Sequence, residues 1–111
     1  MIEMKLQPEF YNYFLNRTKK IEIRLNDEKR RSIKIGDKIK LLKEPDLDEF
    51  FIGEVIGLLN YKDFDSLIDD IDIELLADKN YTKEKLIREL EKFYSKEKQM
   101  KYGVLGIRIK Y

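Results

Sequence analysis

Residues 18–36 read TKKIEIRLNDEKRRSIKIG, and this stretch decides how the rest of the chain is interpreted. Charged and apolar side chains alternate over residues 20–25: Ile21, Ile23 and Leu25 are apolar, whereas Lys20, Glu22 and Arg24 are charged. Successive side chains of a β-strand point to opposite faces, so the alternation predicts a half-buried strand with its charges on the open face. Charges of both signs, spaced about 7 Å apart on a rigid strand, are suited to binding a ligand. This stretch is therefore the first candidate for a functional site.

Composition narrows the classes of protein that fit. The chain has 111 residues, so we expect one domain, residues 1–111, with one modest core. It has no Cys and no His, which excludes disulfides, thiolate zinc sites and the commonest general base. No apolar run is long enough to cross a membrane and no signal peptide is evident, so we expect a cytoplasmic protein. We expect no metal site and no cofactor.

The net charge of +1 conceals a strong asymmetry along the chain. Residues 17–43 carry eleven basic and four acidic groups, and residues 79–111 carry ten and four. Between them, residues 44–78 carry one basic and twelve acidic groups. We therefore expect a bipolar surface, with a basic face that attracts phosphates and an acidic segment open to a protein partner.

The remaining pattern predicts an α+β fold. Strands are expected at residues 1–6, 20–25, 37–43, 50–61 and 105–111, and Gly53 and Gly57 indicate bulges or bends in the long fourth strand. Helices are expected at 8–16, 63–71 and 83–95, and Asn26-Asp27 is a helix-start signal before the basic turn 28–31. Five strands with three inserted or flanking helices favour a small β-barrel.

A family resemblance rests on the same opening stretch. Lys19-x-x-Glu22-x-Arg24 resembles the G-x-K-x-x-E-x-R hallmark of the ASCH domain, although the Gly of that hallmark falls at Arg17. The resemblance continues through the segments 25–30, 35–37, 93–98 and 101–104, so that it spans nearly the whole chain. It implies a PUA-like β-barrel with a cleft, lined by the motif residues, for RNA or a nucleotide-like ligand.

The first functional hypothesis is an RNA- or nucleotide-binding domain with a basic cleft. The residues expected to contact the ligand are Lys19, Lys20, Glu22, Arg24, Asp27, Lys29, Arg30, Tyr94, Lys98 and Tyr102. The cations would meet phosphates or base edges, Glu22 would orient Arg24 or accept from a base, and a tyrosine would stack an unpaired base. The alternation places Lys20 on the same face of the strand as Glu22 and Arg24, whereas the family motif uses Lys19. We favour Lys19 as the residue inside the cleft, with Lys20 beside it.

Two alternatives remain open from the sequence. The first is a small hydrolase acting on a modified nucleoside or on RNA, with Lys19, Glu22 and Arg24 as its catalytic residues. A branch of the resembled family hydrolyses an acetyl amide on cytidine with a Lys, a Thr and a Glu, but Glu22 occupies the Thr position here. The second alternative is a surface ladder of ion pairs that binds nothing.

Overall fold

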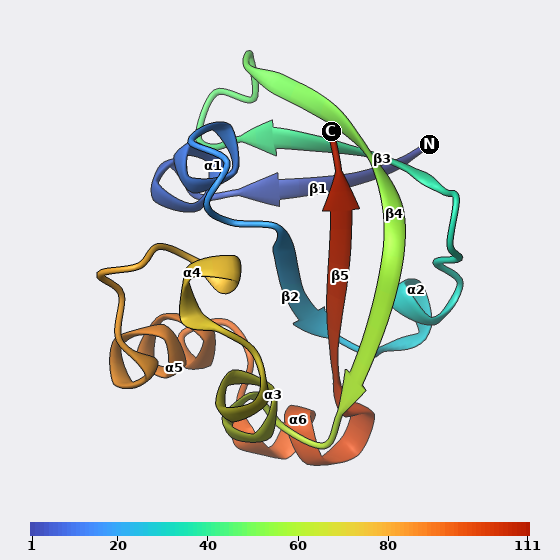
Figure 1. Ribbon diagram of the computed structural model, residues 1–111. Helices are drawn as coiled ribbons and strands as arrows, with labels where there is room; N and C mark the ends of the chain where they lie inside the picture. The colour runs from blue at the N-terminus through green and yellow to red at the C-terminus, as the bar shows by residue number, and fades with distance from the viewer.

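A mixed sheet of five strands forms the centre of the molecule, and the computed structural model describes all of residues 1–111. The strands are β1 (Ile2–Leu6), β2 (Ile21–Leu25), β3 (Lys38–Lys43), β4 (Phe50–Tyr61) and β5 (Val104–Lys110). Their order is β1-β3-β4-β5-β2, with β1 parallel to β3 and every other pair antiparallel. The sheet curls into a half-barrel with β1 and β2 as its two edges (Figure 1). The predicted α+β class is confirmed.

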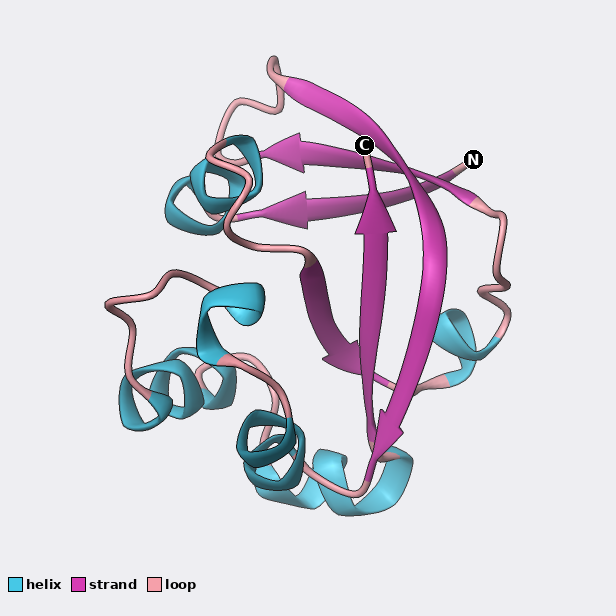
Figure 2. Ribbon diagram, in the orientation of Figure 1, coloured by secondary structure: helices cyan, strands magenta, loops and turns pink.

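Six helices surround the sheet, where the sequence predicted three. They are α1 (Pro8–Leu15), α2 (Glu28–Arg31), α3 (Phe64–Asp70), α4 (Ile73–Leu76), α5 (Lys83–Glu91) and α6 (Lys96–Tyr102). Figure 2 shows α3 to α6 grouped on one side of the sheet, below α1 in this view. The three additional helices, α2, α4 and α6, are short, and the four residues of α2 and of α4 are too few for apolar periodicity to reveal.

The helix predicted at 83–95 ends four residues early, and a separate helix, α6, begins just beyond the predicted range. Helix α5 ends at Glu91, and the Ser95 hydroxyl then accepts a hydrogen bond from the backbone N–H of Lys98 (3.2 Å). Ser is a favoured N-cap residue because its oxygen satisfies an otherwise unpaired N–H in the first turn. Ser95 therefore starts α6 where the apolar spacing alone suggested that the first helix would be ending.

Strand β2 is covered on both faces, which corrects the expectation of an open charged face. Its apolar residues Ile21, Ile23 and Leu25 belong to a core formed with the helices α3 to α5. On the other face, Glu22 lies opposite Ile107 and Arg24 lies opposite Leu105 in the register with β5. Ile107 and Leu105 belong to a second core, formed by β1, β3, β4, β5 and α1. The charged side of β2 therefore faces the interior of the protein.

Strand β4 bends where the sequence predicted it. Its register with β5 shifts between Val55 and Gly57, as expected of a β-bulge. At Gly53, an added Cβ would overlap Cγ2 of Ile109, so a larger residue would displace that buried side chain. These features let a twelve-residue strand pair with β3 at one end and β5 at the other. No helix of the protein is long and apolar enough to span a membrane.

Candidate ligand site in the seam of the half-barrel

Lys19 lies at the centre of the candidate site and is almost completely buried, with 2% of its surface exposed. Its Nζ donates hydrogen bonds to the backbone oxygens of Ile21 (2.6 Å) and Leu76 (2.8 Å), and lies 3.3 Å from Oε1 of Glu22. An ammonium group has three N–H donors, and these three acceptors satisfy all of them. The same Nζ lies 5.1 Å from the centre of the Phe14 ring, within cation–π range.

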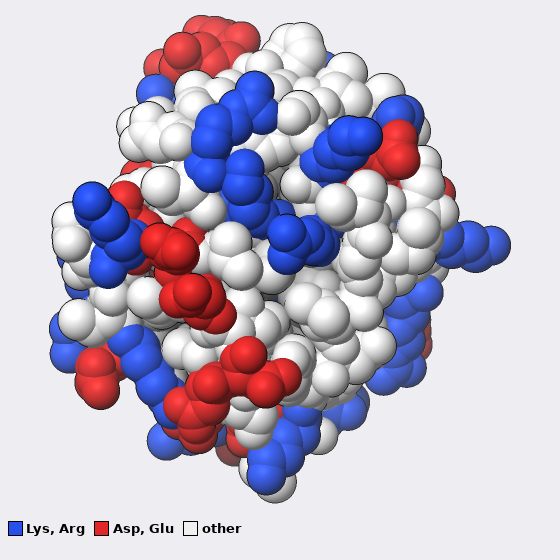
Figure 3. All heavy atoms as spheres, viewed as in Figure 1, with Lys and Arg blue, Asp and Glu red and all other residues white.

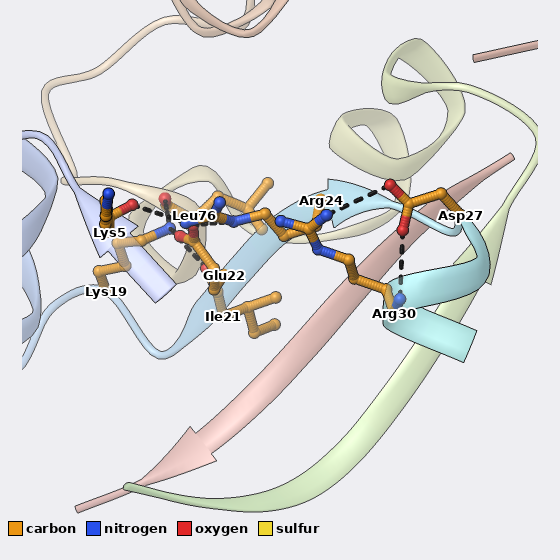
Figure 4. Close-up of polar contacts among 8 residues, drawn as sticks. All are labelled: Lys5, Lys19, Ile21, Glu22, Arg24, Asp27, Arg30 and Leu76. Carbon is orange, nitrogen blue, oxygen red and sulfur yellow. Dashed lines mark hydrogen bonds and ion pairs between the residues drawn. The ribbon is translucent and has the colours of Figure 1, made fainter. Parts of the chain in front are cut away.

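Glu22 joins Lys19 to Arg24. Its Oε2 accepts a hydrogen bond from Nε of Arg24 (2.8 Å), and Figure 4 shows the two cations approaching the carboxylate from opposite sides. Arg24 also donates from Nη2 to the backbone oxygen of Lys5 (2.8 Å). Lys5 is on the edge strand β1 and Arg24 on the edge strand β2, so this bond crosses the gap between the two edges, which we call the seam.

Glu22 and Arg24 favour the ionised state in each other, although burial opposes it, whereas burial prevails at Lys19. Burial would raise the pKa of Glu22, but the neighbouring Lys19 and Arg24 outweigh it and leave that pKa below its usual value. For Arg24, burial is again offset, here by Glu22 and Tyr94, and the pKa is raised. For Lys19, burial dominates the opposing effect of Glu22, and the pKa is lowered.

A cavity of about 400 Å³ opens onto this network. Its walls come from β1, α1, β2, α2 and α5, together with residues that flank β1, β2, β3 and α5 in the sequence. The lining residues are Glu3, Met4, Lys5, Leu6, Gln7, Phe10, Lys19, Glu22, Ile23, Arg24, Lys29, Arg30, Glu44, Leu86, Glu89, Leu90, Phe93 and Tyr94. We call this space the seam cavity. Its size falls within the range of ligand-binding pockets in proteins.

Six of the ten residues that the sequence analysis proposed line the seam cavity. They are Lys19, Glu22, Arg24, Lys29, Arg30 and Tyr94. Lys29 and Arg30 reach the cavity from α2, whose first turn is capped by Asp27: Oδ1 of that residue accepts from the backbone N–H of Arg30 (3.1 Å). Figure 4 shows the Arg30 side chain, which pairs with Asp27, extending from α2 on the Arg24 side of the network.

The other four do not line the cavity. Asp27 instead holds Arg30 and the start of α2, as described above. Lys20 is fixed through its backbone, whose N–H donates to Leu75 and whose oxygen accepts from Ile109. Tyr102 packs against the core beneath the helices, and Lys98 is exposed on α6.

The structure adds residues that sequence reasoning missed. Phe93 is 57% exposed and lines the cavity beside Tyr94, although only Tyr94 was proposed. Edge strand β1 contributes Glu3 and Lys5, and Glu44 and Glu89 also line the wall. The aromatic pair Phe93-Tyr94 lies between Lys92 and Lys96, and this pattern is a usable sequence signal for Phe93. Nothing local in the sequence indicates that β1 lies against β2.

The charges around the seam cavity are mixed, in contrast to the basic cleft that was expected. Five cationic side chains are balanced by four carboxylates, those of Glu3, Glu22, Glu44 and Glu89. Elsewhere the two signs separate: Figure 3 shows acidic side chains gathered over α3 and α4. A site with both signs suits a ligand that presents an anionic group and hydrogen-bond donors together.

Arg17, at the position of the family's Gly, adopts a backbone conformation that favours glycine, with φ of +67°. Its side chain points to the C-terminal residue: Nη1 donates to the backbone oxygen of Tyr111 (2.7 Å), and the guanidinium lies 4.2 Å from the centre of that ring. Arg17 therefore adds no charge to the seam cavity.

Comparison with known proteins identifies structural relatives. No protein-family model and no curated protein sequence matches the chain. The crystal structure of hypothetical protein PH0355 matches with a TM-score of 0.84 and 35% identity, over 97% of this chain and 95% of that one. The solution structure of PF0455 from Pyrococcus furiosus matches with a TM-score of 0.74 and 35% identity, over 98% and 94%. A mutant ZmASCH from Zymomonas mobilis matches with a TM-score of 0.60 and 12% identity, over 98% of this chain and 66% of that one.

Proposed function

The chain belongs to the protein family that includes PH0355 and PF0455 and has an ASCH-type fold, and on this basis we propose that it binds RNA or a nucleotide-like ligand in the seam cavity. The observation that carries the proposal is that the three charged residues of the K-x-x-E-x-R motif meet at one cavity of ligand size. They are Lys19, Glu22 and Arg24. Charged residues are rarely buried unless they are paired, and a buried charge network beside a cavity is typical of a functional site.

The side chains divide into two roles. Lys19 and Glu22 are fully engaged with one another and with backbone groups, so they hold Arg24 in place. Arg24 uses Nε and Nη2 for these contacts and also interacts with Tyr94, so a ligand in the seam cavity would meet the remaining N–H donors of Arg24 beside that ring. Lys5 and Lys29 form no ion pair within the protein and line the same cavity, so they supply charge for a phosphate.

The hydrolase alternative has less support from this geometry. Lys19 would have to act as a base, and its lowered pKa favours that role. Its Nζ, however, donates to two backbone oxygens and lies against Glu22, so it has no lone pair directed at a substrate. Mass spectrometry of acetylated cytidine and short RNAs, incubated with wild type and Glu22→Gln, separates the alternatives: binding without turnover is expected, and turnover lost in the variant would favour the hydrolase.

The binding proposal is tested by the salt dependence of affinity for single-stranded RNA. We expect the double variant Lys29→Ala and Arg30→Ala to weaken binding and to reduce the slope of log K against log salt by about 1.4, which is about 0.7 for each cation on a single strand. The matched control is Lys62→Ala with Lys79→Ala, which removes the same charge from exposed positions outside the cavity. The proposal fails if wild type does not bind RNA at low salt, or if both double variants weaken binding equally.

A further inference from the structure

The seam cavity follows the edge of strand β1 rather than one of its faces. Five consecutive residues, 3–7, line it. Side chains of a strand alternate between faces, so a cavity against one face would meet every second residue. Contact with all five indicates that the cavity lies along the unpaired edge, where backbone N–H and C=O groups are accessible.

Two observed hydrogen bonds show which backbone groups point into the cavity. β1 pairs only with β3, and in a parallel pair alternate residues direct both backbone groups to the partner strand. The oxygen of Leu6 accepts from the backbone N–H of Glu44, just beyond β3 (2.8 Å), whereas the oxygen of Lys5 accepts from Arg24 on β2. Lys5 and Glu3 therefore direct their backbone groups into the seam. The Lys5 oxygen is occupied by Arg24, which leaves the Glu3 C=O and the Lys5 N–H as a neighbouring acceptor and donor.

We propose that this edge of β1 recognises one unpaired nucleobase in the seam cavity, by hydrogen bonds to the Glu3 C=O and from the Lys5 N–H. The inference rests on the proposed function and specifies the part of the ligand that is read. A nucleobase presents a donor next to an acceptor on its Watson–Crick edge, in one plane, and this complements an acceptor and donor on a strand edge.

The other walls of the cavity fit the rest of a nucleotide. Phe93, Tyr94 and Leu90 line it and offer apolar and aromatic surface for the face of a base. The Lys5 and Lys29 side chains are available for a phosphate. A volume of about 400 Å³ is near the lower end of ligand pockets, which suits one nucleotide rather than several.

An extended peptide added to the sheet edge fits less well. Strand addition depends on a continuous row of backbone hydrogen bonds. Here Arg24 already takes the Lys5 oxygen and interrupts that row. The geometry therefore favours a short planar ligand over a peptide strand.

Two variants at one position isolate the backbone group. Lys5→Ala removes the amine and keeps the N–H, whereas Lys5→Pro removes both. Because the Lys5 N–H faces the seam, proline there removes no bond of the sheet, and edge strands tolerate it. The probes are the four ribonucleoside 5′-monophosphates, with ribose 5-phosphate as the ligand that lacks a base.

We expect wild type and Lys5→Ala to bind at least one nucleotide about tenfold or more tightly than ribose 5-phosphate. Lys5→Pro should reduce this ratio to about one. N3-methylation of a pyrimidine nucleotide that binds, or N1-methylation of a purine nucleotide, should do the same in wild type. An unchanged ratio in Lys5→Pro, or equal binding of ribose 5-phosphate and nucleotides by wild type, overturns the inference.

Amide hydrogen exchange measured by NMR decides the question even if Lys5→Pro does not fold. Saturating nucleotide should slow exchange of the Lys5 N–H while leaving the Met4 N–H, which faces β3, unchanged. Unchanged exchange at Lys5, or slowing by an extended peptide instead of a nucleotide, overturns the inference. If either of these results is found and wild type still binds RNA, only the inference of base recognition by β1 is rejected. If wild type binds neither RNA nor nucleotide, the proposed function is rejected as well.

Discussion

Two three-membered ion clusters of mirrored composition occur in this protein, and they differ in burial. In the seam, the carboxylate of Glu22 lies between the cations Lys19 and Arg24. On the surface, Lys83 pairs with the carboxylates of Asp65 (2.9 Å) and Asp69. The Lys83 side chain is 30% exposed and both aspartates more than 60%, compared with 2% to 12% for the buried cluster.

Charge pattern alone therefore does not distinguish a functional site from a surface ion cluster. Exposed ion pairs contribute little because water screens them and their side chains lose entropy on pairing. A buried cluster requires each member, since removing one leaves the others desolvated without a partner. The seam cluster is therefore both a structural link between β1, β2 and α4 and the floor of the cavity.

The largest expected difference is in stability. Glu22→Gln leaves two buried cations without a counter-charge and should lower the free energy of unfolding by about 3–5 kcal/mol. The surface counterpart, Lys83→Ala, should leave it unchanged within error. Urea unfolding of the three proteins measures both effects. Equal stability of Glu22→Gln and wild type would contradict the structural role of the cluster.

The pH dependence of stability should differ between wild type and Glu22→Gln. The pKa of Glu22 is lowered in the folded protein, so its contribution is present above the ordinary value of 4.5 and is lost as the pH falls through the folded pKa. The stability difference between the two proteins should therefore shrink in acid. Unfolding curves from pH 7 down to the acid limit of the fold test this, and a constant difference would exclude an ionised Glu22.

Coupling within each cluster gives a smaller effect. A double-mutant cycle of Lys19→Met and Glu22→Gln should show a coupling energy of about 1–3 kcal/mol. Each single variant already loses the Lys19–Glu22 interaction, so the second substitution costs less stability in the double variant than it does alone. The surface cycle of Lys83→Met and Asp69→Asn should show no coupling beyond error. Chemical unfolding of all variants measures it, and equal coupling in the two cycles would remove the distinction drawn between the clusters.

The smallest expected effect is that of salt. At 1 M salt the screening length falls to about 3 Å, so any stabilisation from the exposed Lys83 cluster should disappear. The cost of Glu22→Gln should persist because its cluster is shielded from mobile ions. Unfolding at low and high salt compares the two, and a Glu22→Gln effect abolished by salt would contradict burial of the cluster.

Much of the fold can be predicted from local pattern, and much of the site cannot. Alternation in residues 20–25 locates β2 because its apolar side chains face a single core. The same alternation groups Lys20 with Glu22 and Arg24. Lys19, however, precedes the strand, which begins at Ile21, so the alternation of faces does not determine where the Lys19 side chain points. The family motif supplied what periodicity could not.

Long-range placement accounts for the remaining differences. Lys5 lies at the site because the curled sheet brings its two edge strands, β1 and β2, together. The local sequence of neither strand indicates that the other lies beside it. The basic turn at Lys29 and Arg30 was recognised as a local cluster, but the carboxylates that balance it come from β1, α5 and the segment after β3. Net charge along the chain therefore overestimated how basic the cavity is.

The central claim is that the seam cavity is where a nucleic-acid ligand binds. NMR titration of the amide-labelled protein with short single-stranded RNA tests it most directly. We expect the largest shifts at residues 3–7, 22–24, 29–30 and 93–94, which line the cavity. Shifts confined to α3 and α4, or to the exposed side of β4, or no shifts at all at low salt, would contradict it.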